Sequence, residues 1–267
     1  MVFGSKGKLF LIAGPCVIED PVKTIRLAGE LAEIAKEHSI PLIFKASYDK
    51  ANRTSIDSFR GPGLEEGLKV LARIKAMFNL PILTDVHQVS EVKPVAEVAD
   101  ILQLPAFLCR QTDLCVALGE TGKTINIKKG QFLAPWDIKN VIEKIERTGN
   151  KNIILTERGT CFGYNNLVVD MRSLIVMRQF GYPVVFDATH SVQIPGGHGN
   201  GTAGDSRYVP YLSRAAVACG CDGLFWEVHP NPKFAKSDKD NAIPLSSVPA
   251  TWRICSKIND LVAKSQA

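Results

Sequence analysis

The 267-residue chain has an ordinary globular composition, with 45% apolar and 22% charged residues. It has no long polar stretch, which excludes disorder for most of its length, and no run approaches the roughly 18 apolar residues of a transmembrane span. The net charge of +5 is mild and no block of Lys and Arg stands out, so small anionic ligands are favoured over nucleic acid. The seven cysteines, in a long chain without an export signal, predict reduced thiols.

The first apolar run, residues 9–13, follows two lysines but has only five residues. A signal peptide needs an apolar region of roughly 7–15 residues, so this run predicts a buried strand of an intracellular protein. A helix over residues 21–38 is expected next. Asp20 is its N-cap, Pro21 takes the first helical position, and the apolar residues that follow keep helical spacing.

Short apolar runs then alternate with amphipathic segments along the whole chain. Most runs are continuous, as strands buried on both faces should be. The expected strands are residues 9–13, 42–44, 82–83, 101–104, 125–127, 153–155, 184–186 and 224–226. The expected helices are residues 21–38, 64–78, 89–98, 113–118, 136–147, 167–180, 208–219 and 247–263.

Eight strand–helix pairs in this length give about 33 residues per pair, the size of one βα unit. This count favours a single (β/α)8 TIM barrel, of class α/β, over a doubly wound sheet. Gly14-Pro15-Cys16 follows the first strand, where a dinucleotide-binding sheet would carry GxGxxG. No linker interrupts the pattern, so one domain is expected over residues 1–267.

Basic residues gather just after the predicted strands, where such barrels carry their chemistry. An unpaired buried charge costs several kcal/mol, so a convergence of charge at one mouth predicts charged ligands. The cluster suits an anion with more than one charged group, such as a carboxylate plus a phosphate. Its members are Lys45, Lys50, Arg53, Lys128 and Arg158.

A second set combines thiol, imidazole and carboxylate groups: Cys16, His190, Glu227 and Asp238. They follow the first, seventh and eighth strands, which are neighbours in a closed barrel, so they can converge on a divalent transition metal. No short CxxC or HExxH spacing supports the site. A lone cysteine after a strand also fits a small buried apolar residue, and both interpretations stay open.

Two other motifs receive weaker interpretations. Cys219-Gly220-Cys221 precedes the last predicted strand and is expected to be structural. The glycine-rich segment 195–201 is compatible with a mobile lid over the mouth or with a plain connector.

Several long motifs, in order, resemble those of 3-deoxy-D-manno-octulosonate 8-phosphate synthase, also called 2-dehydro-3-deoxyphosphooctonate aldolase. They are AGPC at 13–16, FKASYDKANRTS at 44–55, LPAFLCRQTD at 104–113, NIKKGQF at 126–132, TERG at 156–159, FGYNNLVVD at 162–170 and DATHSVQ at 187–193. The resemblance extends to about residue 245, nearly the whole chain.

The resemblance implies a cytoplasmic transferase that condenses phosphoenolpyruvate with D-arabinose 5-phosphate for lipopolysaccharide biosynthesis. It also implies a homotetramer with active sites shared at an interface, and no nucleic-acid or membrane partner. The family has a metal-independent branch with Asn at the position of Cys16. Cys16 therefore implies the branch with one divalent ion per subunit, for which Zn2+, Fe2+ and Mn2+ are candidates.

Roles are implied residue by residue. The implied catalytic residues are Lys45, Lys50, Asn52, Lys128, His190 and Asp238. The phosphoenolpyruvate site resembles Lys45, Lys50, Lys128 and Arg158, with Ser47 and Gln103 nearby, and the sugar phosphate site resembles Asn52, Arg53 and Thr54. Phe107 and Arg110 resemble a segment that reaches a neighbouring subunit, and the implied metal ligands are Cys16, His190, Glu227 and Asp238.

Three alternatives are weighed against this interpretation. The sister synthase that uses erythrose 4-phosphate carries Lys-Pro-Arg-Thr where this chain has KANRT at 50–54. A Schiff-base aldolase needs a lysine of lowered pKa, whereas a bound anion raises the pKa of a lysine. A non-catalytic sugar-phosphate or RNA-binding module would not need the metal-ligand set, and RNA binding would need an exposed basic and aromatic surface.

Overall fold

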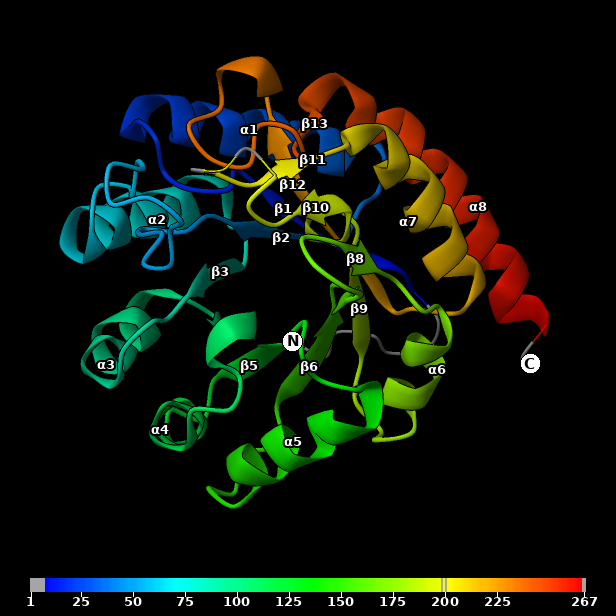
Figure 1. Ribbon diagram of the computed structural model, residues 1–267. Coiled ribbons are helices and arrows are strands. Elements are labelled where there is room, and N and C mark those ends of the chain that lie inside the picture. The colour runs from blue at the N-terminus through cyan, green and yellow to red at the C-terminus, as the bar shows by residue number, and fades with distance from the viewer. Residues whose placement is uncertain (1–7, 198, 200, 266–267) are drawn as a thin grey trace.

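The computed structural model describes residues 8–197, 199 and 201–265. Eight parallel strands run in sequential order around a barrel, which closes where the first strand pairs with the last. Figure 1 shows the strands at the centre with the helices outside them. The barrel strands are β1 (Phe10–Gly14), β2 (Leu42–Lys45), β3 (Ile82–Asp85), β4 (Ile101–Leu104), β5 (Thr124–Lys128), β6 (Ile153–Glu157), β9 (Val184–Asp187) and β12 (Gly223–His229).

One helix follows each barrel strand, so the predicted TIM-barrel class is confirmed. The helices are α1 (Pro21–Glu37), α2 (Leu64–Phe78), α3 (Val89–Val98), α4 (Thr112–Glu120), α5 (Lys139–Glu146), α6 (Arg172–Arg178), α7 (Val209–Ala218) and α8 (Val248–Ser265). A large apolar core lies between these helices and the barrel. The predicted cap of α1 is present, because the Asp20 carboxylate accepts a hydrogen bond of 2.8 Å from the Lys23 amide. None of the described helices is long and apolar enough to span a bilayer.

Side chains alternate along a strand, and this alternation places the site. A second apolar cluster is formed by side chains from seven of the barrel strands: Phe10, Ile12, Ile43, Leu83, Ile101, Ile154, Val185 and Phe225. The residues two positions further along are Gly14, Lys45, Asp85, Gln103, Thr156, Asp187 and Glu227. A residue and its i+2 neighbour share a face, so the barrel changes from an apolar to a polar layer towards its carboxyl end.

Gly14 ends β1 where two backbones approach closely. A Cβ atom at this position would lie 1.9 Å from the Lys45 carbonyl oxygen. Only glycine therefore allows β1 and β2 to keep this register, which brings Lys45 next to the loop that carries Cys16.

The structure departs from the predicted elements after β6. The helix expected over 167–180 is the shorter α6, and an antiparallel pair, β7 (Thr160–Cys161) and β8 (Leu167–Val168), precedes it. The Asp170 carboxylate accepts a 3.0 Å hydrogen bond from the Arg172 amide, so the helix starts after that residue.

Other departures are small. The segment expected over 136–147 is a 3-10 turn, Pro135–Ile138, followed by α5. Short strands also form, namely β10 (Gln193–Ile194), β11 (Ala203–Gly204) and β13 (Ile243–Pro244). In the glycine-rich segment, positions 198 and 200 lie outside the described residues, so the lid interpretation is not tested.

Candidate active site

Lys45 and Lys50 occupy the carboxyl mouth of the barrel beside the carboxylate of Glu227. The ammonium of Lys45, almost wholly buried, donates to the Cys16 carbonyl oxygen and to Glu227 Oε1, both at 2.9 Å. Lys50 Nζ lies 3.7 Å from Asp85 Oδ2 and 4.0 Å from Glu227 Oε1. Both ammonium groups are therefore held beside carboxylates at the carboxyl end of the barrel.

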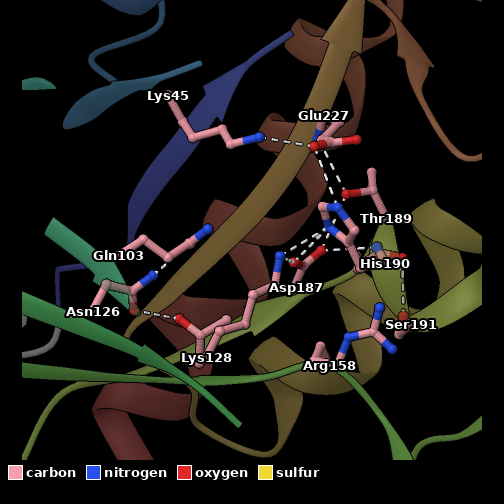
Figure 2. Close-up of polar contacts among 12 residues, drawn as sticks. Lys45, Gln103, Asn126, Lys128, Arg158, Asp187, Thr189, His190, Ser191 and Glu227 are labelled. Atoms are coloured by element: carbon pink, nitrogen blue, oxygen red, sulfur yellow. Dashed lines mark hydrogen bonds and ion pairs between the residues drawn. The ribbon is translucent and has the colours of Figure 1, made fainter. Parts of the chain in front are cut away.

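Asp187 joins Lys128 to His190 at the centre of Figure 2. Its Oδ2 atom lies 2.6 Å from Lys128 Nζ and 2.7 Å from His190 Nδ1, while Oδ1 accepts the His190 amide at 2.8 Å. Burial lowers the pKa of Lys128, and Asp187 opposes that effect. For Asp187 itself, burial raises the pKa, but His190 and Lys128 outweigh it and hold the carboxyl ionised.

Arg158 presents buried donors that lack partners. Its Nη2 donates to Gln193 Oε1 at 2.5 Å, whereas Nε and Nη1 are buried and make no hydrogen bond within the part of the chain that the structure describes. Burial also lowers the pKa of Arg158. Unpartnered guanidinium donors are costly to bury, and a planar carboxylate or phosphate satisfies them well. This is the strongest sign of an anion site in the structure.

A hydrogen-bonded row of polar side chains lines one side of the barrel, from β2 to β6. Ser47 donates to Asp85 at 2.6 Å, and Gln103 donates to the other oxygen of the same carboxylate. Asn126 donates to Gln103 at 2.9 Å and accepts from Thr156 at 2.6 Å. These mutual bonds fix the rotamers of Ser47 and Gln103, both predicted near phosphoenolpyruvate.

Three of the four predicted metal ligands converge. One ligand atom from each of Cys16, Glu227 and Asp238 lies within 4.8 Å of the others, and Cys16 Sγ is 3.1 Å from Asp238 Oδ2. His190 is not part of that group of three, but it lies next to Glu227, with Nε2 at 3.3 Å from Oε1. In this conformation its ring is drawn between the carboxylates of Asp187 and Glu227.

The donor set fits a divalent ion. Glu227 Oε2 is buried and makes no hydrogen bond among the described residues, so it has an electron pair available for a cation. Burial would raise the pKa of Glu227, but His190 and Lys45 hold it well below its usual range. Burial and the Glu227 charge raise the pKa of the Cys16 thiol, and a coordinated cation would reverse that effect by stabilising the thiolate.

The predicted sugar phosphate residues line a separate pocket that opens beside the metal group. It has a volume of about 440 Å³ and is lined by Asn52, Arg53, Thr54, Ser58, Gly201, Thr202, Ala235, Lys236, Ser237, Asp238 and Lys239. Arg53 donates to Ser237 Oγ at 2.7 Å, and Cys16 Sγ lies 3.1 Å from the same hydroxyl. Arg53 therefore links the phosphate pocket to the metal group through one side chain.

Phe107 and Arg110 are not brought to this site. Both are exposed on the segment after β4, and Phe107 is 58% accessible. The contacts found within the described residues do not connect their side chains to the residues above. Their predicted role needs a second subunit.

Sequence reasoning assigned no role to Asp85, Asp187 or Ser237. Asp85 and Asp187 end their strands on the inward face, two positions after an apolar residue of the inner cluster. Their positions at the ends of apolar runs were visible in the sequence and could have identified them as candidates. Ser237 carried no such signal, because it lies in a loop whose path depends on the tertiary structure.

Comparison with known proteins settles the family. The sequence model of the DAHP synthetase I family matches residues 1–263. The chain belongs to the DAHP synthetase I family. Three curated relatives, all named 2-dehydro-3-deoxyphosphooctonate aldolase, are similar to it over most of their length.

The relative from Geobacter metallireducens is 59% identical over 259 residues, 97% of this chain and 95% of that protein. The one from Trichlorobacter lovleyi is 61% identical over 242 residues, which are 91% of this chain and 89% of that protein. The one from Fusobacterium nucleatum is 58% identical over 262 residues, which are 98% of this chain and 94% of that protein. The predicted resemblance is confirmed: the chain is an enzyme of this family, and the relatives support the sister synthase less well.

Proposed function

We propose that this enzyme condenses phosphoenolpyruvate with D-arabinose 5-phosphate and water, and releases 3-deoxy-D-manno-octulosonate 8-phosphate and inorganic phosphate. The observation that carries the proposal is the buried cationic mouth with the unpartnered donors of Arg158, next to the Cys16 group. The name of the relatives, similar along the whole chain, supports the choice of reaction.

The cations would hold phosphoenolpyruvate through its two anionic groups. Lys128 lies at the end of β5 and Arg158 in the turn after β6, whereas Lys45 ends β2 and Lys50 lies in the loop that follows it. The two substrates are both anions and repel one another, so fixed Lys and Arg side chains offset that repulsion. They also hold the reacting carbons in line.

Carbon–carbon bond formation would proceed from C3 of the enol phosphate to the aldehyde carbon of the sugar. Water adds at C2, and the resulting hemiketal phosphate loses inorganic phosphate. Asn52, Arg53 and Thr54 would anchor the phosphate at the far end of the sugar, which places the aldehyde end towards Cys16 and Asp238.

A divalent ion held by Cys16, His190, Glu227 and Asp238 would supply Lewis-acid polarisation or orientation of a substrate oxygen when bound. His190 would contribute its Nε2 atom, because Asp187 engages Nδ1.

The decisive experiment is a phosphate-release assay with phosphoenolpyruvate and a panel of four- and five-carbon sugar phosphates. Turnover is expected with arabinose 5-phosphate and not with erythrose 4-phosphate. The opposite preference would show that the enzyme is the sister synthase.

Arg53→Ala should raise KM for the sugar phosphate by about 10- to 100-fold, since a hydrogen bond to a charged group contributes about 1.5–3 kcal/mol. KM for phosphoenolpyruvate should change much less. Arg172→Ala removes an exposed arginine that pairs with Asp170 and serves as the control. An equal loss for both substrates in Arg53→Ala would contradict the assignment.

We also infer a homotetramer in which Arg110 and Phe107 enter a neighbouring subunit's site. Exposed aromatic residues on the same side of the barrel, Phe132 and Trp136, support an interface there. Arg110→Ala and Lys128→Ala should each be inactive, and mixing the two proteins under subunit exchange should restore part of the activity, because hybrids contain complete sites. Failure to recover activity in well-exchanged mixtures would exclude a shared site.

A further inference from the structure

Lys129 is adjacent to the site residue Lys128 but has a different environment. Strand alternation sends the two side chains to opposite faces, so Lys128 reaches the mouth while Lys129 packs among the loops that follow β5 and β6. Its side chain is fully buried, with 0% accessibility. The proposed reaction gives it no role.

The Lys129 ammonium ties together the two loops. It donates to the carbonyl oxygens of Gly130 at 3.2 Å and Leu133 at 3.1 Å, which belong to the loop after β5. It also donates to the carbonyl oxygen of Gly159, in the turn after β6, at 3.4 Å, and to Oγ1 of Thr160, the first residue of β7, at 3.1 Å. Loss of the ammonium would leave these buried acceptors without their shared donor.

The same ammonium supports the carboxylate that shapes the turn. Glu157 Oε1 lies 3.6 Å from Lys129 Nζ and accepts hydrogen bonds from the amides of Arg158 at 2.8 Å and Gly159 at 2.6 Å. Gly159 adopts φ +90°, which favours glycine. Without Lys129, the Glu157 charge would be buried without its ion-pair partner, so the turn would lose its support.

Arg158 depends on this turn more than on its own side-chain contacts. The guanidinium bonds to Gln193, and two of its nitrogens have no hydrogen-bond partner among the described residues. Its direction into the site is therefore set largely by the backbone from which it projects.

We propose that Lys129 is a positioning residue that, together with Glu157, holds the turn carrying Arg158 and thereby sets the affinity for phosphoenolpyruvate. The inference rests on the proposed function, in which Arg158 binds that substrate. Wild-type turnover with phosphoenolpyruvate and arabinose 5-phosphate tests the function by itself, before any Lys129 variant is considered.

Lys129→Met keeps the length of the side chain and removes its charge. We expect KM for phosphoenolpyruvate to rise about tenfold, with a smaller change in kcat and in KM for the sugar, because small misplacements of a binding group are costly. Titration calorimetry with phosphoenolpyruvate alone should show the same loss of affinity. The control is Lys75→Met, which removes a lysine paired with Asp100 at the other end of the barrel and should leave both constants unchanged.

A double-mutant cycle tests whether Lys129 acts through Arg158. Arg158→Ala and Arg158→Ala/Lys129→Met should bind phosphoenolpyruvate equally weakly; a further tenfold loss in the double variant would overturn the proposal. Thr160→Val removes one hydrogen-bond partner of Lys129, and we expect it to lower the affinity for phosphoenolpyruvate about threefold. This variant decides the matter if Lys129→Met does not fold. Lower thermal stability with unchanged phosphoenolpyruvate affinity, in either folded variant, would also refute the inference.

Discussion

Exhaustive chelation is expected to abolish turnover, and added Zn2+, Fe2+ or Mn2+ should restore it. The reason is the donor set, in which a thiol, a carboxylate with an unpartnered oxygen and a second carboxylate lie within 4.8 Å of one another. A mixture of soft and hard ligands accepts several divalent ions, and geometry selects among them. Elemental analysis of the purified protein, with activity followed during chelation and reconstitution, is the measurement. A metal-free protein with full activity would refute the site.

Cys16→Asn sharpens this test. The amide can hydrogen-bond where the thiolate would bind an ion, so metal affinity should fall by more than about 100-fold, beyond what loss of an outer partner costs. Activity that survives in this variant and resists chelation would indicate that the metal only positions groups. The matched control is Cys219→Asn, the same chemical change at the end of α7, which should leave metal content unaltered.

Asp187→Asn should have the second largest effect. Lys128 and His190 both lie against one oxygen of the buried carboxylate, Oδ2, at 2.6 and 2.7 Å, and Oδ1 accepts the His190 amide. Asparagine removes the negative charge and places an NH2 donor either against the two side chains or against that amide. We expect kcat/KM to fall by at least about 100-fold, together with weaker metal binding, because both side chains lose their orientation. The measurements are steady-state kinetics and metal titration on protein shown to be folded by circular dichroism.

The control for Asp187→Asn is Asp222→Asn. Asp222 is also a largely buried carboxylate, but it pairs with Arg178 and accepts from the Val184 amide at the opposite end of the barrel. Breaking that pair should lower the thermal stability of the protein without a selective decrease in metal affinity or in kcat/KM. If the two variants behaved alike, the effect at Asp187 would be one of stability alone.

Much of the fold could be predicted because strand burial leaves a direct record in the sequence. A strand covered on both faces is mainly apolar, so β1 appears as a continuous apolar run, and β6 and β9 each begin with three apolar residues. The start of α1 at Asp20 and Pro21 could also be predicted, because helix capping depends only on residues that are neighbours in the sequence. The pair β7 and β8 was missed, because two-residue strands bury too little surface to leave a pattern.

The candidate site was predictable to the level of residue type and strand end. The sequence by itself determined that Cys16, Lys45 and Glu227 follow strands meeting at one mouth, because parallel strands in a closed barrel share a carboxyl end. Only the tertiary structure decided that Lys128 faces Asp187 while the Lys129 side chain bonds to the loops that follow β5 and β6. The face that a strand residue occupies, and the partner it finds there, depend on register with strands distant in the sequence, and that register is established only when the barrel closes.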